Sequence, residues 1–328
     1  NFIDSGTFTN VEAVVNNHGY ERTSQIFSGG FNAKYSGDDG WSASFDFGYS
    51  RTDRSELSLE TNAGTGYGPG VGATDTLDFV STRTGTRFTS SQLDYSDPDL
   101  MVLTDPLGWG AGAPLGHQEG YYNDRIIDDE LKSYQIEFGK EVDSGFLSKV
   151  TAGLGYTDRT KSKTPNEYFL NLANGATSLV LPDQYRMSAT DLDIIGVGPI
   201  LSYDPFQLLE DGVYVLTANP SKDVPAKAYS VTERVMSAYL MADIKAAVGS
   251  AELTGNVGVL AQNTEQKSRG FQNLAAADLV PTTRGATYWD VLPSANLSLR
   301  FPSDFVIRLS GAREIQRPRF EDMKVSLD

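Results

Sequence analysis

Apolar and polar positions alternate along two neighbouring segments near the start of this chain. In residues 27–35 and 41–49, every second residue is aromatic, alanine or glycine, and the residues between them are mostly small, polar or charged. Because successive side chains of a strand point to opposite faces, each segment has one apolar and one polar face. Asp38-Asp39-Gly40 between the two segments is a tight-turn sequence. The pattern predicts an antiparallel hairpin.

The same alternation recurs along the chain and predicts eight long strands in four hairpins. The expected strands cover residues 23–37, 41–54, 131–142, 146–158, 231–246, 250–266, 287–301 and 304–317. Short turns close the hairpins at 38–40, 143–145, 247–249 and 302–303. The connections between hairpins have 76, 72 and 20 residues, at 55–130, 159–230 and 267–286. We expect sequential pairing, with the four turns on one edge.

The lengths of these strands and loops indicate a membrane barrel. The expected strands have 12 to 17 residues, whereas about 9–11 cross a bilayer and about 5–6 are usual in a soluble sheet. Short turns at one end and long loops at the other are the asymmetry of outer-membrane barrels. The predicted fold class is all-β, an antiparallel up-and-down transmembrane β-barrel segment with long extracellular loops. The alternative is a soluble β-sandwich, with two sheets packed about 10 Å apart.

Composition narrows the classes of protein without choosing between these two folds. The mean hydropathy is −0.31, and no run of 18 apolar residues occurs, which excludes helical membrane spans. The 16 Tyr, 16 Phe and 32 Gly residues suit a barrel with aromatic girdles but also a soluble β protein. A net charge of −16 disfavours nucleic acid as a partner, because that binding needs a basic patch. There is no cysteine and therefore no disulfide framework.

Motifs for catalysis or metal binding are absent from the sequence. The only two histidines, His18 and His117, are 99 residues apart, and no hydrolase or zinc motif surrounds them. A run of carboxylates offers oxygen ligands for calcium, but a solvated rim is the favoured interpretation; it comprises Asp124, Asp128, Asp129 and Glu130. We therefore expect neither enzyme activity nor a cofactor or metal site.

The two longest loops contain the candidate ligand-binding residues. Aromatic faces pack on sugar rings, and carboxylate, imidazole and amide groups bind hydroxyls, so a mixture of these side chains is typical of small-molecule sites. The first loop supplies Asp105, Trp109, His117, Tyr121, Tyr122 and Asn123, and the second supplies Asn166, Tyr168 and Tyr185. The alternative, which we favour for the aromatic residues, is that they hold the loops to each other.

The alternation also assigns the two faces of the expected strands. Aromatic residues beside the short turns suit a girdle at the membrane interface: Tyr35, Trp41, Phe138, Phe146, Phe301 and Phe305. In the second hairpin, Leu154 belongs to the apolar, lipid-facing set and Thr151 to the polar, lumen-facing set. Arginine at a lipid-facing position is therefore expected to be far more damaging than arginine at a lumen-facing one.

Three stretches of the fourth hairpin carry a family resemblance. They read YWDVLPSANL at 288–297, FVIRLSGAR at 305–313 and IQRPRF at 315–320. Together they resemble a conserved barrel stretch of TonB-dependent outer-membrane receptors. Residues 2–10 and 27–32 also resemble a large-loop proteobacterial branch of that family, which is often linked to saccharide import.

The resemblance implies a 22-stranded barrel, an N-terminal plug and a short box that engages TonB. Residues 1–328 are then one partial barrel domain, and the plug, the box and the closing strands lie outside it. The chain begins with Asn1, which also suggests an internal piece of a longer protein. The implied location is the cell outer membrane. The implied partners are a small-molecule ligand, the lipid bilayer and TonB, the last through the missing N-terminal region.

Three classes of function stay open. The first is a receptor that actively imports a scarce nutrient, with a saccharide as the first choice of ligand by resemblance and a ferric siderophore as the second. The next is a passive porin or structural barrel. The last is a soluble β-sandwich adhesin or glycosidase, in which the aromatic faces form a buried core.

Overall fold

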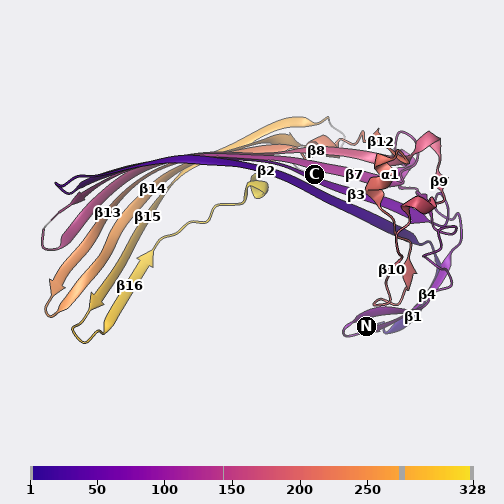
Figure 1. Ribbon diagram of the computed structural model, residues 1–328, viewed down its shortest axis with the longest axis horizontal. Coiled ribbons are helices and arrows are strands. Elements are labelled where there is room, and N and C mark those ends of the chain that lie inside the picture. The colour runs from indigo at the N-terminus through magenta and orange to yellow at the C-terminus, as the bar shows by residue number, and fades with distance from the viewer. Residues whose placement is uncertain (1–2, 143, 273–277, 326–328) are drawn as a thin grey trace. The chain divides into compact units, whose positions relative to one another are not determined.

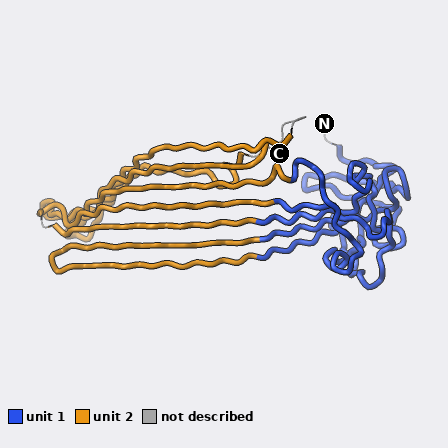
Figure 2. Tube along the Cα trace, turned by 90° about the horizontal axis from the view of Figure 1, so that it is seen from above, with its two compact units in different colours: residues 1–23, 55–126, 165–224 blue, residues 24–54, 127–164, 225–328 orange. Residues whose placement is uncertain are grey.

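The computed structural model describes residues 3–142, 144–272 and 278–325. Two residues discussed above, Phe2 in the family resemblance and Asp143 in the second turn, lie outside these ranges. The chain forms two compact units, each built from separated stretches of sequence (Figure 2). Unit 1 contains residues 1–23, 55–126 and 165–224, and unit 2 contains residues 24–54, 127–164 and 225–328.

Eight long strands follow one another in the main sheet. They are β2 (Val14–Ser36), β3 (Trp41–Gly64), β7 (Gly120–Glu141), β8 (Leu147–Leu172), β13 (Tyr229–Val248), β14 (Ala251–Gln272), β15 (Val280–Arg300) and β16 (Val306–Ala312). Each strand pairs with the next in this order, and the registers from β8 to β16 are antiparallel (Figure 1). This is the sequential order that the alternation predicts, and the predicted fold class is confirmed.

Most of these strands are longer than predicted. β3 has 24 residues and β8 has 26, because backbone pairing continues beyond the last alternating apolar residue into polar sequence. β16 is shorter and ends at Ala312, so the prediction of a strand to residue 317 is wrong. The N–H of Arg313 donates the last backbone hydrogen bond of this strand to β15, at the carbonyl of Pro293, and residues 314–319 belong to no strand.

The outward face of unit 2 is an apolar belt that the registers make continuous. Ala152, Leu240, Val259 and Pro293 lie side by side on β8, β13, β14 and β15. The belt extends from the Val248–Ala251 turn to Met236 and Asn263, twelve residues along each strand. At about 3.3 Å per residue and a tilt of about 45°, this is roughly 28 Å of height, close to the ~25 Å band of membrane barrels.

Aromatic residues at the turn end of this belt are exposed to the surroundings. Tyr35, Trp41, Phe138, Phe146 and Phe305 are each at least half exposed, and the Phe301 ring packs at a tilt of 40° against Phe305 with 5.9 Å between ring centroids. An aqueous protein would bury such residues in a core. Their exposure beside the short turns is what an interfacial girdle requires.

The polar face of unit 2 is partly covered by the chain that follows β16. Arg317 binds Glu233 at 2.8 Å, Lys161 binds Glu321 at 3.1 Å, and the guanidinium of Arg159 lies 4.5 Å from the centre of the Phe320 ring. The 3₁₀ helix η4 (Phe320–Met323) belongs to this covering segment. Its packing buries alternate residues of β13 on this face, Val231, Glu233 and Val235.

Unit 1 folds the long connections into defined structure. β1 (Ser5–Val11), β4 (Asp75–Thr82) and β5 (Gly85–Ser90) form a three-stranded sheet. The short strands are β6 (Val102–Thr104), β9 (Ser178–Leu179), β10 (Thr190–Asp191), β11 (Pro199–Ile200) and β12 (Tyr214–Ala218), and the helices are η1 (Trp109–Gly112), η2 (Ala173–Gly175), η3 (Asp183–Tyr185), α1 (Pro205–Glu210) and α2 (Asp223–Ala226). None of the described helices has the length and apolar character that a membrane crossing requires.

A hydrophobic core holds unit 1 together. Leu59 of β3, Leu103 of β6 and Leu170 of β8 are fully buried in it, as are Leu181 and Leu208 from the second long connection. Burial of these five leucine side chains stabilises unit 1 by on the order of 10 kcal/mol, at roughly 2 kcal/mol for each side chain. The long loops are therefore a packed layer of structure and not flexible connections.

Candidate ligand-binding site in the long loops

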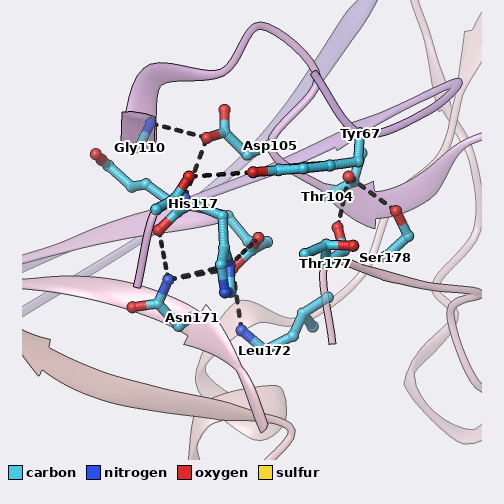
Figure 3. Close-up of polar contacts among 12 residues, drawn as sticks. Tyr67, Thr104, Asp105, Gly110, His117, Asn171, Leu172, Thr177 and Ser178 are labelled. Carbon is cyan, nitrogen blue, oxygen red and sulfur yellow. Dashed lines mark hydrogen bonds and ion pairs between the residues drawn. The ribbon is translucent and has the colours of Figure 1, made fainter. Parts of the chain in front are cut away.

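Asp105 organises the first long loop through its carboxylate. Its two oxygens accept hydrogen bonds from three backbone N–H groups, those of Trp109 at 2.9 Å, Gly110 at 2.8 Å and Gln118 at 3.1 Å. The side chain is fully buried, and Figure 3 shows its hydrogen bond with Gly110. A carboxylate with three N–H donors has little capacity left for a ligand, so Asp105 shapes the loop that presents Trp109.

The loop around Trp109 is fastened to the glycine-rich segment 64–72. The N–H of Gly68 donates to the carbonyl of Asp105 at 2.9 Å, and the Tyr67 hydroxyl donates to the carbonyl of Gly116 at 3.1 Å. These two hydrogen bonds hold the glycine-rich segment against the loop. The two segments together expose four apolar side chains, Val71, Leu107, Trp109 and Leu115.

His117 belongs to a buried polar cluster next to this loop. Its Nδ1 lies 2.7 Å from Oε1 of Glu119, and its carbonyl accepts a hydrogen bond from the Asn171 amide at 2.6 Å (Figure 3). The other Glu119 oxygen accepts from the N–H of Leu172 at 3.1 Å. Burial raises the pKa of Glu119 above its ordinary value, although the bonds from Leu172 and His117 act against that rise. The cluster joins the first loop to the end of β8.

Tyr121 and Tyr122 contact the second long connection. The Tyr121 hydroxyl donates to Glu167 and accepts from the Asn219 amide at 2.8 Å. The Tyr122 ring meets Tyr168 edge-on, with 5.9 Å between centroids, and also packs against the hydrophobic core. These contacts are of the kind expected if the aromatics hold the loops to each other.

The remaining predicted residues fall into different surroundings. Tyr185 is buried in the hydrophobic core of unit 1. Asn123 and Asn166 are half-buried, and the Asn123 side-chain oxygen is one of a few buried polar atoms in the described residues without a hydrogen-bond partner. The structure thus brings Asp105, Trp109 and His117 together in one loop and places the contact between Tyr122 and Tyr168 beside Tyr121 in another cluster. Trp109 is the most exposed of the nine, at 50%.

Sequence reasoning missed the polar partners that hold these clusters together. Glu119 and Glu167 lie within two residues of predicted positions, and Asn171 and Asn219 lie farther along the second connection. No local pattern marks them, because their roles arise only when strands β7, β8 and β12 come together.

The four carboxylates of the acidic run do not converge on a common point. Asp124 accepts from Ser55 at 2.6 Å, Asp129 pairs with Arg159 at 2.6 Å, and Glu130 pairs with Lys132 at 2.6 Å. Within the described part of the chain, no group of three or more acidic, histidine or cysteine side chains is arranged to hold a metal ion.

Charge is divided unequally between the two units. Unit 1 contains 21 of the 43 acidic residues but only 6 of the 27 basic ones, a net charge of −15 out of −16 for the chain. Unit 2 is therefore almost neutral. An acidic surface of this kind attracts cations and repels anions over about a Debye length, ~8–10 Å at moderate salt.

The sequence matches the family described as TonB dependent receptor-like, beta-barrel, over residues 74–326. The chain belongs to this family. Family barrels lie in the outer membrane and act in transport and not as enzymes, so the chain is an outer-membrane barrel segment.

Among solved structures, the TonB-dependent receptor segment is similar to the siderophore receptor PiuA from Acinetobacter baumannii. The identity is 12% and the TM-score 0.33, and the match covers 90% of this chain and 46% of that one. The segment therefore spans about half the length of that receptor. No curated protein matches the chain.

Proposed function

We propose that this chain forms wall and loops of a receptor that captures a neutral, hydroxyl-rich nutrient, a saccharide, for active import. TonB would supply the energy through a region of the receptor outside this sequence. The observation that carries the choice of ligand is the charge of unit 1, −15. An anionic ferric chelate would meet electrostatic repulsion there, whereas a neutral sugar would not.

The exposed apolar group around Trp109 supports capture by stacking. The Asp105 hydrogen bonds fix the backbone of η1, which reduces the entropy lost when a ligand orders the loop. Trp109 then offers a large aromatic face in the company of Val71, Leu107 and Leu115. Aromatic faces of this kind pack on the apolar face of a sugar ring, while neighbouring polar groups bind the hydroxyls.

The test is a titration of the full-length protein with neutral gluco- and xylo-oligosaccharides and, separately, with the anionic ferric citrate complex. We expect a neutral oligosaccharide to bind, and Trp109→Ala to weaken that binding by roughly fivefold or more, because aromatic packing contributes about 1 kcal/mol beyond buried area. Trp289→Ala is the matched control, since Trp289 is 69% exposed on the outward face of unit 2.

Two results would contradict the proposal. Tight binding of the ferric complex without binding of any neutral sugar would favour the siderophore alternative. Equal affinity of wild type and Trp109→Ala for the bound sugar, together with a lower melting temperature of the variant, would show that Trp109 only packs the loops.

A further inference from the structure

The apolar belt of unit 2 ends in one row of side chains, at the end of the strands away from the short turns. This row contains Tyr156 on β8, Met236 on β13, Asn263 on β14 and Trp289 on β15, which the registers place side by side. Met236 and Trp289 are 61% and 69% exposed. Amphipathic Tyr and Trp at the boundary between an apolar belt and polar sequence mark the membrane interface.

Polar side chains replace apolar ones in the next three rows of the same face. The rows beyond Trp289 are Asp158, Arg234, Glu265 and Thr287; then Thr160, Thr232, Lys267 and Gly285; then Ser162, Ser230, Arg269 and Thr283. At about 6.7 Å per two residues of strand, these rows lie at the depth of lipid headgroups. Three cations and several hydroxyls are therefore held directly above the lipid-facing belt.

Two of the three cations have no partner among the side chains that the structure describes. Arg234 is held by Asp158 at 3.0 Å and faces Glu265 at 3.9 Å. Lys267 and Arg269 are exposed, and neither forms an ion pair or side-chain hydrogen bond with any residue that the structure describes. Since they are two residues apart on one strand, their side chains point the same way with Cα atoms about 7 Å apart.

The surface around these two cations is hollowed. One hollow of about 210 Å³ is lined by Thr232, Arg234, Glu265, Lys267 and Arg269. A second, of about 460 Å³, shares Arg269 with the first and adds, on the same face, the hydroxyl groups of Ser162, Ser230 and Thr283 and the ring of Phe271. Cations, hydroxyl groups and apolar side chains in adjoining hollows fit a phosphorylated sugar headgroup whose acyl chains continue down the belt.

We infer that Lys267 and Arg269 bind the phosphates of a glycolipid of the lipid A type, in the membrane leaflet on the long-loop side. Three observations favour a lipid over a dissolved anion. The face is continuous with the lipid-contacting belt, Lys267 and Arg269 form no ion pair with a described residue, and Trp289 and Tyr156 mark the interface directly below. The inference concerns the outward face of unit 2 and is independent of the ligand captured by unit 1.

The experiment measures binding of bisphosphorylated lipid A to the full-length protein in detergent by native mass spectrometry. We expect Lys267→Ala/Arg269→Ala to weaken binding roughly 30-fold, since each cation near an anionic lipid surface contributes about a fivefold factor. Arg300→Ala/Arg308→Ala is the matched control, because both arginines are exposed on the polar face. It should bind like wild type. Lys267→Arg/Arg269→Lys should retain binding.

Further measurements distinguish a lipid phosphate from a dissolved phosphate, and a second variant is available if the first does not fold. Lipid A lacking one phosphate should bind more weakly, and inorganic phosphate should not displace the lipid. If the Ala variant fails to fold, Lys267→Gln/Arg269→Gln keeps polar, exposed side chains and gives the same comparison. The inference is wrong if the folded variant binds lipid A like wild type, if the control loses as much affinity, or if inorganic phosphate competes.

Discussion

At the scale of single residues, Asp75 shows how unit 1 fixes a loop with one carboxylate. It is 1% exposed and accepts hydrogen bonds from Tyr95, from Ser91, and from the N–H groups of Thr76 and Gln92. Burial alone would raise the pKa of Asp75, but these bonds outweigh it and leave the pKa below its ordinary value. The carboxylate therefore ties the start of β4 to residues 91–95 while it is ionised.

The lowered pKa gives a pH dependence with a defined sign. Stability from Asp75 is present above its unfolded pKa of about 3.9 and is lost as pH falls through the lower, folded-state value. Asp75→Asn should reduce the local free energy of opening of residues 75–95 at neutral pH by about 1–3 kcal/mol, because an amide cannot accept every bond. It should also remove this acid-dependent contribution.

Hydrogen exchange of peptides from residues 75–95, corrected for the intrinsic pH dependence of exchange, measures this prediction. Asp99→Asn in the same loop is the control, because Asp99 is exposed and its carboxylate accepts no hydrogen bond among the described residues. If wild type and Asp75→Asn lose protection equally as the pH falls, Asp75 is not the source of the acid dependence.

Residue roles in the loops could be predicted from the sequence only in part. Residue type selected Asp105, Trp109 and His117, which the structure places in one loop. Residue type could not show that three N–H groups donate to the Asp105 carboxylate or that His117 forms a hydrogen bond with Glu119. These hydrogen bonds depend on the positions of backbone atoms, which are set by strands that are distant in the sequence.

At the scale of the strand, β8 shows that alternation assigns faces correctly. Leu154 is 59% exposed on the outward face, and Thr151 is 2% exposed on the polar face. The low exposure of Thr151 changes the expected cost of arginine there, because a crowded wall has no space for it. Thr151→Arg is therefore a poor control, and Ser294, exposed on the polar face of β15, is better.

Leu154→Arg should destabilise the full-length protein by roughly 2–4 kcal/mol if Leu154 lies at the bilayer midplane, because the charge enters the hydrocarbon. Ser294→Arg should cost much less, since its side chain is exposed on the polar face and the charge does not enter the hydrocarbon. The folded fraction after refolding into lipid vesicles over a urea series measures both. Similar losses for the two variants would contradict the assignment of faces.

At the scale of the whole molecule, two of the eight long strands have a single partner among the described residues. In the described structure, β2 pairs only with β3, and β16 pairs only with β15. A strand with one open side presents unpaired N–H and C=O groups, which is a template for pairing with another chain. The exposed apolar belt adds to this tendency, because the exposure of apolar surface to water is unfavourable.

The 328-residue chain, refolded in water without lipid or detergent, should therefore self-associate. Its mass by light scattering should exceed the monomer mass of 35.6 kDa and rise with concentration. Detergent should cover the belt but leave the edges open, so it should reduce the association only in part. A monodisperse aqueous monomer with a cooperative melt would count heavily against the open-edge interpretation.

By itself, the sequence determined the eight strands, their order and their two faces. The physical reason is local: side chains alternate with a period of two along any strand, and short turns leave neighbouring strands adjacent. The tertiary structure decided where each strand ends, that residues 313–325 cover the polar face, and that the long connections pack around Leu59 and Leu208. It also decided that Lys267 and Arg269 have no ion-pair partner among the described residues, because a partner from another strand follows from register and not from sequence spacing.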